Sequence, residues 1–310
     1  DPVGFFYAQL VTRAISTTLQ SGLRGVIQSF EQGNLDASQT GWAATQHALS
    51  QIGRVEPIHT GLALATRSAE RVNRLRRGES ETVATGFPWY DQRFGGWRIG
   101  DFNAIAGRPG VGKTTILLRT LWTALLDCDQ VMLVSMEMSG EDIINRMLAM
   151  WGGLSGGQGA NPRWHNLGQV SEWGYSRMLD DTASASAYLS RLRVVEGKLR
   201  KSVESIARVV ERDRPGILFI DGLRMLRPSG KFQSTWEQLA SVVDDVKTLA
   251  LDCRIPVIAT VQLGRTGTKR RGLGVEHLAG SDVFVQDASA VFAVMMPTSL
   301  DDKCDDLFKH

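Results

Sequence analysis

The sequence predicts an α/β protein in which a mainly parallel sheet is flanked by helices and preceded by a small helical hairpin and a linker helix. Three observations lead to this expectation. From residue 85 onward, short apolar runs alternate with helical patterns, as in sheets covered by helices on both faces. A glycine-rich turn stands between one such run and a helix. Before residue 85, apolar residues recur at helical spacing instead.

The expected strands are short apolar runs rich in β-branched residues. They cover residues 102–106, 131–136, 192–195, 217–221, 256–262 and 290–295. Apolar residues three and four apart predict helices at residues 116–126, 140–150, 203–212 and 236–252. Glycines and tryptophans interrupt the order at residues 151–166, which we interpret as a surface insertion, with a base-stacking loop as the alternative.

The N-terminal part of the sequence predicts two helices joined by a turn-rich connector. Residues 7–30 and 42–52 have apolar positions at helical spacing. In the connector, Asp36 and Ser38 are the candidate N-caps of the second helix. We therefore expect a helical hairpin over residues 1–57.

A third helical pattern, at residues 62–78, is amphipathic and carries five arginines. It fits either a solvated surface helix or a helix that docks on a partner. A polar segment follows it, so we expect a linker region over residues 58–84 and the α/β domain over residues 85–310.

The composition limits the class of protein. The chain has 310 residues, which suffices for one large α/β domain and a smaller piece. A net charge of +2 neither requires nor excludes a nucleic-acid partner. No apolar run approaches a membrane span, and Cys128, Cys253 and Cys304 lack metal-site spacing. We expect a soluble protein with reduced thiols and no membrane partner.

GRPGVGKTT, at residues 107–115, matches the phosphate-loop pattern. In this pattern backbone N–H groups surround a phosphate, a lysine (Lys113) reaches the terminal phosphates, and a hydroxyl (Thr114) holds Mg²⁺. A helix begins directly after the loop, and helix N-termini favour anions. The sequence therefore predicts a site for ATP and Mg²⁺. Its nucleotide-binding residues are expected to be Gly107, Arg108, Pro109, Gly110, Val111, Gly112, Lys113, Thr114 and Thr115.

Three polar residues at strand ends are expected beside this loop. Asp221 can hold Mg²⁺, or it can merely cap the following turn. Glu137 can orient or deprotonate the attacking water, or it can be a surface residue that opens a helix. Gln262 can sense the γ-phosphate through its amide, or it can simply end its strand.

Five stretches follow one another in a characteristic order: TGFPWYDQRFGGWRIGDFNAIAGRPGVGKTT, SMEMSGEDIINRMLA, LFIDGLRML, WEQLASVVDDVKTLALDCRIPVIATVQLGR and QDASAVFAV. In these stretches, from residue 85 to about 296, the chain resembles the DnaB family of replicative DNA helicases. The resemblance implies a RecA-like P-loop ATPase core in a homohexameric ring that threads single-stranded DNA. It also implies a primase and a helicase loader as partners, in the cytoplasm of a bacterium or of the host of a phage or plasmid.

By position, the resemblance assigns roles to five residues. Lys113 matches the phosphate-binding lysine, Glu137 the catalytic glutamate, and Gln262 the residue that couples the nucleotide to the DNA loops. Thr114 and Asp221 match the two Mg²⁺ residues. The family's Lys/Arg finger is expected beyond residue 310, and much of its N-terminal domain has no counterpart, so we expect the chain to be a fragment.

The chain also departs from the family pattern. Gly222 and Arg224 stand where an aromatic residue and a glutamine are usual, and Ala279 stands where a phosphate-binding arginine is expected. Upstream of Ala279 lies the basic loop RTGTKRRG, which is suited to phosphate backbones or else is a solvated charge run. Its expected DNA-binding residues are Arg265, Lys269, Arg270 and Arg271.

Three functions are compatible with these motifs. The first is an ATP-dependent replicative helicase that unwinds duplex DNA at a replication fork, which SMEM together with VQLGR favours. The second is a RecA-like ATPase of another class, such as a recombination mediator or a regulatory ATPase, that does not unwind DNA. The third is a nucleotide-binding assembly scaffold without turnover.

Overall fold

The computed structural model describes residues 2–51, 60–77, 81–154, 172–196, 202–228, 234–262 and 287–295. The chain divides into two compact units, Asp1–Gly78 and Glu79–His310. The domain boundaries expected after residues 57 and 84 stay predictions. No described helix is both long and apolar enough to cross a membrane.

The first unit contains the predicted helical hairpin. Helices α1 (Pro2–Glu31) and α2 (Leu35–Gln51) pack against each other. The expected N-cap of α2 is wrong, because the Oδ1 atom of Asn34 accepts the hydrogen bond from the backbone N–H of Ala37 at 3.1 Å. Asp36 lies inside the first turn. The second helix therefore begins at Leu35, earlier than its apolar pattern from residue 42 indicates.

Helix α3 (Gly61–Arg76) is the amphipathic helix predicted at residues 62–78. Thr60 caps it by accepting a hydrogen bond from the N–H of Ala63 at 3.2 Å. None of its residues is buried. On its apolar side, Leu64 and Val72 are 50% and 53% exposed. The described residues of its own unit therefore leave this apolar side uncovered.

The second unit opens with elements that the sequence pattern did not predict. Strand β1 (Thr82–Val83) lies in the segment expected to be a polar linker, and it pairs antiparallel with β2 (Trp97–Arg98). Helix α4 (Pro88–Phe94) lies between them. Strands of two residues are too short to show an alternation, which is why the pattern missed them.

The strands that the structure describes in the main sheet are all parallel, in the order β5-β4-β6-β7-β3-β8. They are β3 (Phe102–Gly107), β4 (Val131–Ser135), β5 (Leu192–Glu196), β6 (Ile217–Asp221), β7 (Val257–Gln262) and β8 (Ala290–Val294). Each predicted strand is confirmed to within a residue or two. The parallel α/β fold that the sequence predicts is therefore correct.

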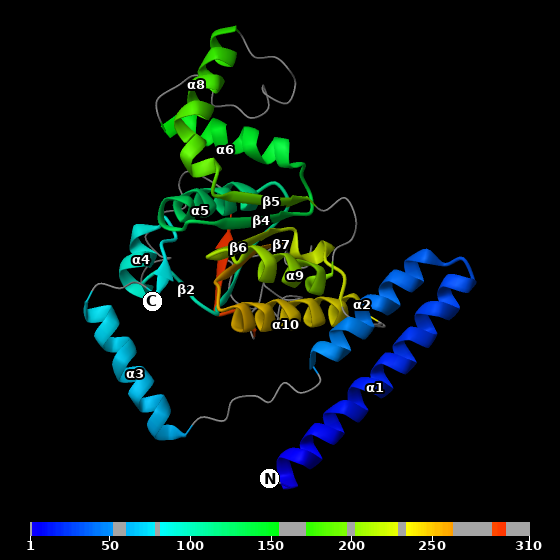
Figure 1. Cartoon of the computed structure of the whole chain (residues 1–310). Helices are drawn as coiled ribbons and strands as arrows, with labels where there is room; N and C mark the ends of the chain where they lie inside the picture. Colours follow the sequence, from blue (N-terminus) through cyan, green and yellow to red (C-terminus); the bar gives the residue numbers. More distant parts are fainter. Residues whose placement is uncertain are drawn as a thin grey trace. The chain divides into compact units, whose positions relative to one another are not determined.

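Helices cover both faces of this sheet (Figure 1). Helices α9 (Val203–Asp213) and α10 (Thr235–Cys253) pack on one face. Helices α5 (Lys113–Asp127), α6 (Gly140–Leu154) and α8 (Glu172–Leu189) belong to the other. Successive strand residues alternate between the faces, so Leu218 joins the α9–α10 core and Phe219 the α5–α6 core.

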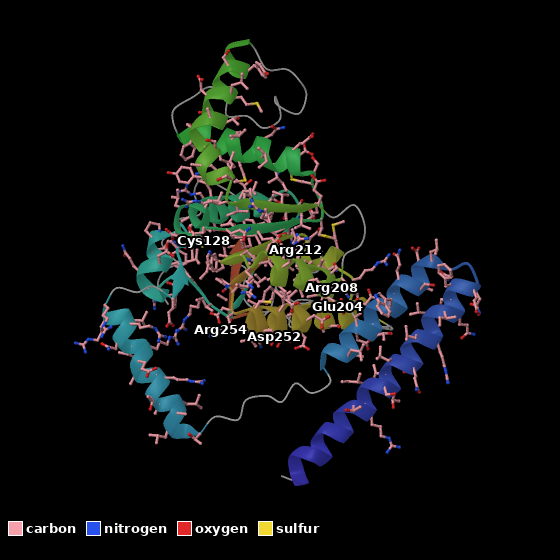
Figure 2. The ribbon with its side chains drawn as sticks, viewed as in Figure 1. Cys128, Glu204, Arg208, Arg212, Asp252 and Arg254 are labelled. Carbon is pink, nitrogen blue, oxygen red and sulfur yellow. The ribbon has the colours of Figure 1, made fainter. Side chains whose placement is uncertain are left out.

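Helix α9 shows how the sequence pattern divides a helix between core and solvent. Val203, Ile206 and Val210 are buried. Glu204, Arg208 and Arg212 recur every fourth residue on its polar side, where Figure 2 labels them. Spacing of this kind is what predicted the helix.

The glycine-rich interruption begins later than the sequence indicates, because α6 continues to Leu154. The Trp151 ring lies 4.9 Å from that of Trp122, centroid to centroid, and its indole N–H donates to the hydroxyl of Ser184 at 3.1 Å. Trp151 is thus part of the contact between α5, α6 and α8. Residues 155–171 lie outside the described residues, so the choice between insertion and base-stacking loop stays a prediction.

Candidate active site

The carboxyl ends of the parallel strands form one edge of the sheet, and the predicted site residues meet there. In the strand register, Gly107 at the end of β3 lies opposite Gln262 at the end of β7. Asp221 at the end of β6 lies opposite Ser135, two residues before Glu137. Ligands of parallel α/β sheets bind at this edge.

Close packing of the chain explains the glycine that begins the phosphate loop. A Cβ atom on Gly107 would lie 2.9 Å from the carbonyl oxygen of Val294 in the neighbouring strand and 2.8 Å from a methyl carbon of Val111. The Nζ atom of Lys113 donates to the carbonyl oxygen of Arg108 at 2.8 Å. The loop is therefore compact, and the first residue of α5 holds its lysine side chain against the loop backbone.

The Lys113 ammonium lies in a partly buried environment of mixed charge. Burial lowers its pKa below the ordinary value, and the negative charges of Glu137 and Asp221 offset part of that decrease. A partly buried cation at a helix N-terminus can neutralise the charge of a bound phosphate.

Asp221 is the buried carboxylate of the site, at 2% exposure. The hydroxyl of Thr114 donates to its two carboxylate oxygens at 3.1 and 3.2 Å. The contact joins the first turn of α5 to the end of β6. It arises because Asp221 lies two residues after Phe219 and so points to the same face of the sheet, which α5 covers.

These groups fit a magnesium ion that is bound together with a nucleotide. Hydroxyl and carboxylate oxygens are the ligands that Mg²⁺ prefers, and Mg²⁺ usually takes its other ligands from water and substrate phosphates. Over the described part of the chain, no cluster of three or more His, Cys, Asp and Glu side chains could hold a metal by itself. Thr114 and Asp221 would hold Mg²⁺ as a pair, completed by the phosphates.

Glu137 contrasts with Asp221 because its side chain is exposed. It lies over the turn that follows β6, where a Cβ atom on Gly222 would be 3.2 Å from the Cγ atom of Glu137. Glu137 and Asp221 thus reach the same edge from neighbouring strands. An exposed carboxylate beside the phosphate loop can contact a water molecule that attacks a bound phosphate.

Gln262 ends β7, as predicted, and its side chain is exposed. The guanidinium of Arg224 donates to the carbonyl oxygen of Gln262 at 3.2 Å. The departure from the family pattern at residue 224 therefore connects the turn after β6 to the end of β7. The predicted DNA residues Arg265, Lys269, Arg270 and Arg271, and also Ala279, lie outside the described residues.

Reasoning from the sequence missed Thr260. Its hydroxyl donates to the Oδ1 atom of Asp221 at 2.7 Å. A signal for it exists, because Thr260 is a hydroxyl residue within the apolar run PVIATV of a buried strand.

The comparisons with known proteins agree with this geometry. The sequence model of the family described as "DnaB-like helicase C terminal domain" matches residues 82–306. The chain belongs to this family. It is similar to the replicative DNA helicase DnaB of Helicobacter pylori (strain ATCC 700392 / 26695), with 29% identity over 62% of this chain and 39% of the relative. It is also similar to the replicative DNA helicase DnaC of Bacillus subtilis (strain 168), with 28% identity over 63% of this chain and 42% of the relative.

The chain therefore spans about two fifths of the length of these DnaB-like relatives. Among solved structures, one described as an ATPase domain has a TM-score of 0.65 at 22% identity and covers 81% of this chain and 86% of its own. A DnaB-like replicative helicase described with its interactions with primase has a TM-score of 0.60 at 22% identity, covering 90% of this chain and 67% of its own. These likenesses support the RecA-like ATPase fold that the sequence predicted.

Proposed function

We propose that this DnaB-like chain is the motor of an ATP-dependent replicative DNA helicase. The observation that carries the proposal is the contact of Thr114 with Asp221, which joins a phosphate loop to a buried strand-end carboxylate. Hydrolysis of a nucleoside triphosphate needs such a pairing to place the metal beside the phosphates. The named relatives are replicative helicases, which favours this function over a recombination or regulatory ATPase.

In the proposed reaction, each site residue at the carboxyl edge of the sheet has a different role. Lys113 and backbone N–H groups of the phosphate loop bind the phosphates, and Thr114 and Asp221 would hold the Mg²⁺ that accompanies the nucleotide. When bound, Mg²⁺ neutralises charge on the phosphate oxygens. Glu137 orients the attacking water and accepts its proton. Gln262 responds to the terminal phosphate through its amide.

The test of the chemistry is the ATPase rate of Glu137→Gln. Removing a general base lowers a rate about 10²–10⁴-fold, so this variant should lose most turnover and still bind nucleotide. Glu141→Gln is the matched control, because Glu141 is an exposed carboxylate in the first turn of α6. The control should hydrolyse ATP at the wild-type rate. Turnover by Glu137→Gln within a few-fold of wild type would remove Glu137 from the mechanism.

We also propose that single-stranded DNA is the polymer on which the motor acts, and that the basic loop with Arg265, Lys269, Arg270 and Arg271 contacts its phosphates. The loop begins three residues after Gln262, so a nucleotide-dependent change at the end of β7 can reach it directly. Contacts of this kind are tolerant of sequence and sensitive to salt.

The triple variant Lys269→Ala, Arg270→Ala, Arg271→Ala should flatten the slope of log affinity against log salt by about 2, because each lost phosphate contact is worth about 0.7 for single strands. Its basal ATPase should survive while stimulation by DNA disappears. The control is Arg208→Ala with Arg212→Ala, which removes exposed cations of α9. Equal slopes for the triple variant and wild type would assign the DNA contact to other residues.

Finally, we propose that the working form is a homohexamer in which α3 docks on a neighbouring copy. The uncovered apolar side of α3 supports this assembly. A primase and a helicase loader are proposed as further partners. One of the similar helicases is described with its interactions with primase, and sedimentation with purified primase tests the same contact here.

A further inference from the structure

Thr260 makes the shortest of the hydrogen bonds that reach the carboxylate of Asp221. It is 3% exposed in the middle of the sheet, and its Oγ1 atom lies 2.7 Å from Oδ1 of Asp221. The same Oγ1 atom accepts a hydrogen bond from the backbone N–H of Gly222 at 2.8 Å. A hydroxyl has one hydrogen to donate. The carboxylate oxygen of Asp221 accepts that hydrogen, while a lone pair of the same hydroxyl oxygen accepts from Gly222.

The backbone of Gly222 explains how this arrangement is held. Its φ and ψ are +97° and 53°, a left-handed conformation that side chains other than glycine rarely adopt. In that conformation its N–H reaches Thr260 in the neighbouring strand. A Cβ atom there would also lie 3.3 Å from the Cβ atom of Met136. The family departure at residue 222 and the hydroxyl at residue 260 therefore belong to one unit.

The two hydroxyl donors to Asp221 come from different places. Thr114 belongs to the first turn of α5 and approaches both carboxylate oxygens at more than 3 Å. Its hydroxyl oxygen is also a proposed ligand of Mg²⁺, so Thr114 has a second role when the nucleotide is bound. Thr260 is fixed inside the sheet and has no such second role. It can orient Asp221 whether or not the nucleotide is present.

We propose that Thr260 is a positioning residue that holds the carboxylate of Asp221 in the orientation required by the Mg²⁺ of the bound nucleotide. The inference rests on the proposed function, because it assumes that the site binds nucleotide with Mg²⁺. It gives a role to the second hydroxyl that donates to Asp221, beside that of Thr114. If Thr260 served only for packing, its methyl group would supply that role and the hydroxyl would not be needed.

The test is the affinity for a fluorescent ADP analogue, measured with Mg²⁺ and again with EDTA. Thr260→Val keeps the shape of the side chain and removes the hydroxyl. It should reduce the gain in affinity that Mg²⁺ provides by about tenfold, the effect of losing one hydrogen bond to a charged acceptor. Its affinity in EDTA should stay within about twofold of wild type, because Asp221 is proposed to act on the nucleotide through Mg²⁺. Thr260→Ser restores the hydroxyl and should restore the gain.

Thr120→Val is the matched control, because Thr120 is a buried threonine whose hydroxyl donates to the carbonyl of Leu117 within α5. It should keep the full Mg²⁺ gain. If Thr260→Val does not fold, Thr260→Ala compared with Thr260→Ser gives the same contrast. An undiminished Mg²⁺ gain without the hydroxyl, or no recovery with serine, overturns the positioning role. A wild-type protein that gains nothing from Mg²⁺ overturns the proposed function and the inference with it.

Discussion

The two units of the chain place their apolar side chains differently. In the unit Glu79–His310, Leu117, Phe219 and many others are completely buried between the sheet and its helices. In the unit Asp1–Gly78, no hydrophobic side chain that the structure describes is buried, and Phe30 is 64% exposed. Both units nevertheless have continuous helices with hydrogen-bonded caps. Helices therefore form in both units, whereas among the described residues only the second unit encloses a hydrophobic core.

The difference follows from the architecture of each unit. A sheet covered on both faces encloses alternate residues of every strand, so the second unit contains its own core. A two-helix hairpin and one further helix offer few residues that can be enclosed, and short isolated structures of this kind are marginal in water. We infer that the first unit is stabilised by contacts with other copies or with partner proteins.

The largest expected effect is on assembly. Leu64→Asp combined with Val72→Asp removes two apolar side chains from the exposed side of α3 and adds two charges. If α3 docks on a neighbouring copy, the lost burial is worth about 3–6 kcal/mol per interface, and the hexamer should dissociate towards monomer in analytical ultracentrifugation. Ser68→Asp with Asn73→Asp adds the same charge at exposed polar positions and should leave the oligomer intact. An unchanged oligomer in the apolar variant would make α3 only a connector.

The next largest expected effect is on the free energy of unfolding, compared between the units by replacing one phenylalanine with alanine in each. Phe219→Ala empties a fully buried position in β6 and should lower the free energy of unfolding of its unit by about 3–5 kcal/mol in urea denaturation. Phe30→Ala changes an exposed position and should alter the stability of the isolated chain by less than about 0.5 kcal/mol. Comparable losses for both variants, measured below the concentration of assembly, would show that the first unit does contain a core.

The smallest expected effect is on the rate at which the partly buried thiol of Cys128 is alkylated. Burial, with the nearby charges of Asp127 and Asp129, raises the pKa of Cys128 to about 11. Cys128 follows α5 and is labelled in Figure 2. Because the thiolate is the reactive form, its alkylation by iodoacetamide at pH 8.5 should be about a hundredfold slower than at an ordinary exposed thiol. Leu64→Cys supplies the exposed thiol in the first unit, and peptide mass spectrometry distinguishes the two sites.

The same shift has a consequence for stability. The unfolded chain releases the Cys128 proton near its ordinary pKa of 9.0, whereas the folded protein retains it until about pH 11. The unfolded state therefore binds fewer protons in this interval, and the contribution of Cys128 to stability falls as the pH rises from about 9 to about 11. Cys128→Ser should abolish this part of the pH dependence. Equal alkylation rates at Cys128 and at Leu64→Cys would contradict the burial.

The sequence predicted most of the fold because buried parallel strands and amphipathic helices leave strong patterns. Helix α9 and strand β6, for example, are nearly identical to their expected ranges. The missed elements have weak signals. Helix α4 has only seven residues, and helix α8 carries polar and small residues on much of its surface. The N-cap Asn34 was missed because neighbouring Asp and Ser residues compete for the same role in the pattern.

At the candidate site, the sequence predicted the residues that motifs specify and missed those that depend on distant contacts. The phosphate loop, Glu137 and Asp221 each follow from a local pattern. The hydrogen bonds of Thr260 and Arg224 join residues 38 or 39 positions apart in the chain, across adjacent strand ends. Local spacing contains no information about such pairs, and only the parallel register brings them together.

The position of β3 between β7 and β8 affects when the site can form during synthesis. Residues 102–107 pair with residues 257–262 on one side and with residues 290–294 on the other. Contacts between parts of the chain so far apart form slowly, because a long loop must close before they stabilise anything. On the ribosome, β3 and its glycine loop emerge well before either neighbour has been made. A nascent chain therefore acquires a complete phosphate-binding loop only after nearly all of the second unit has been translated.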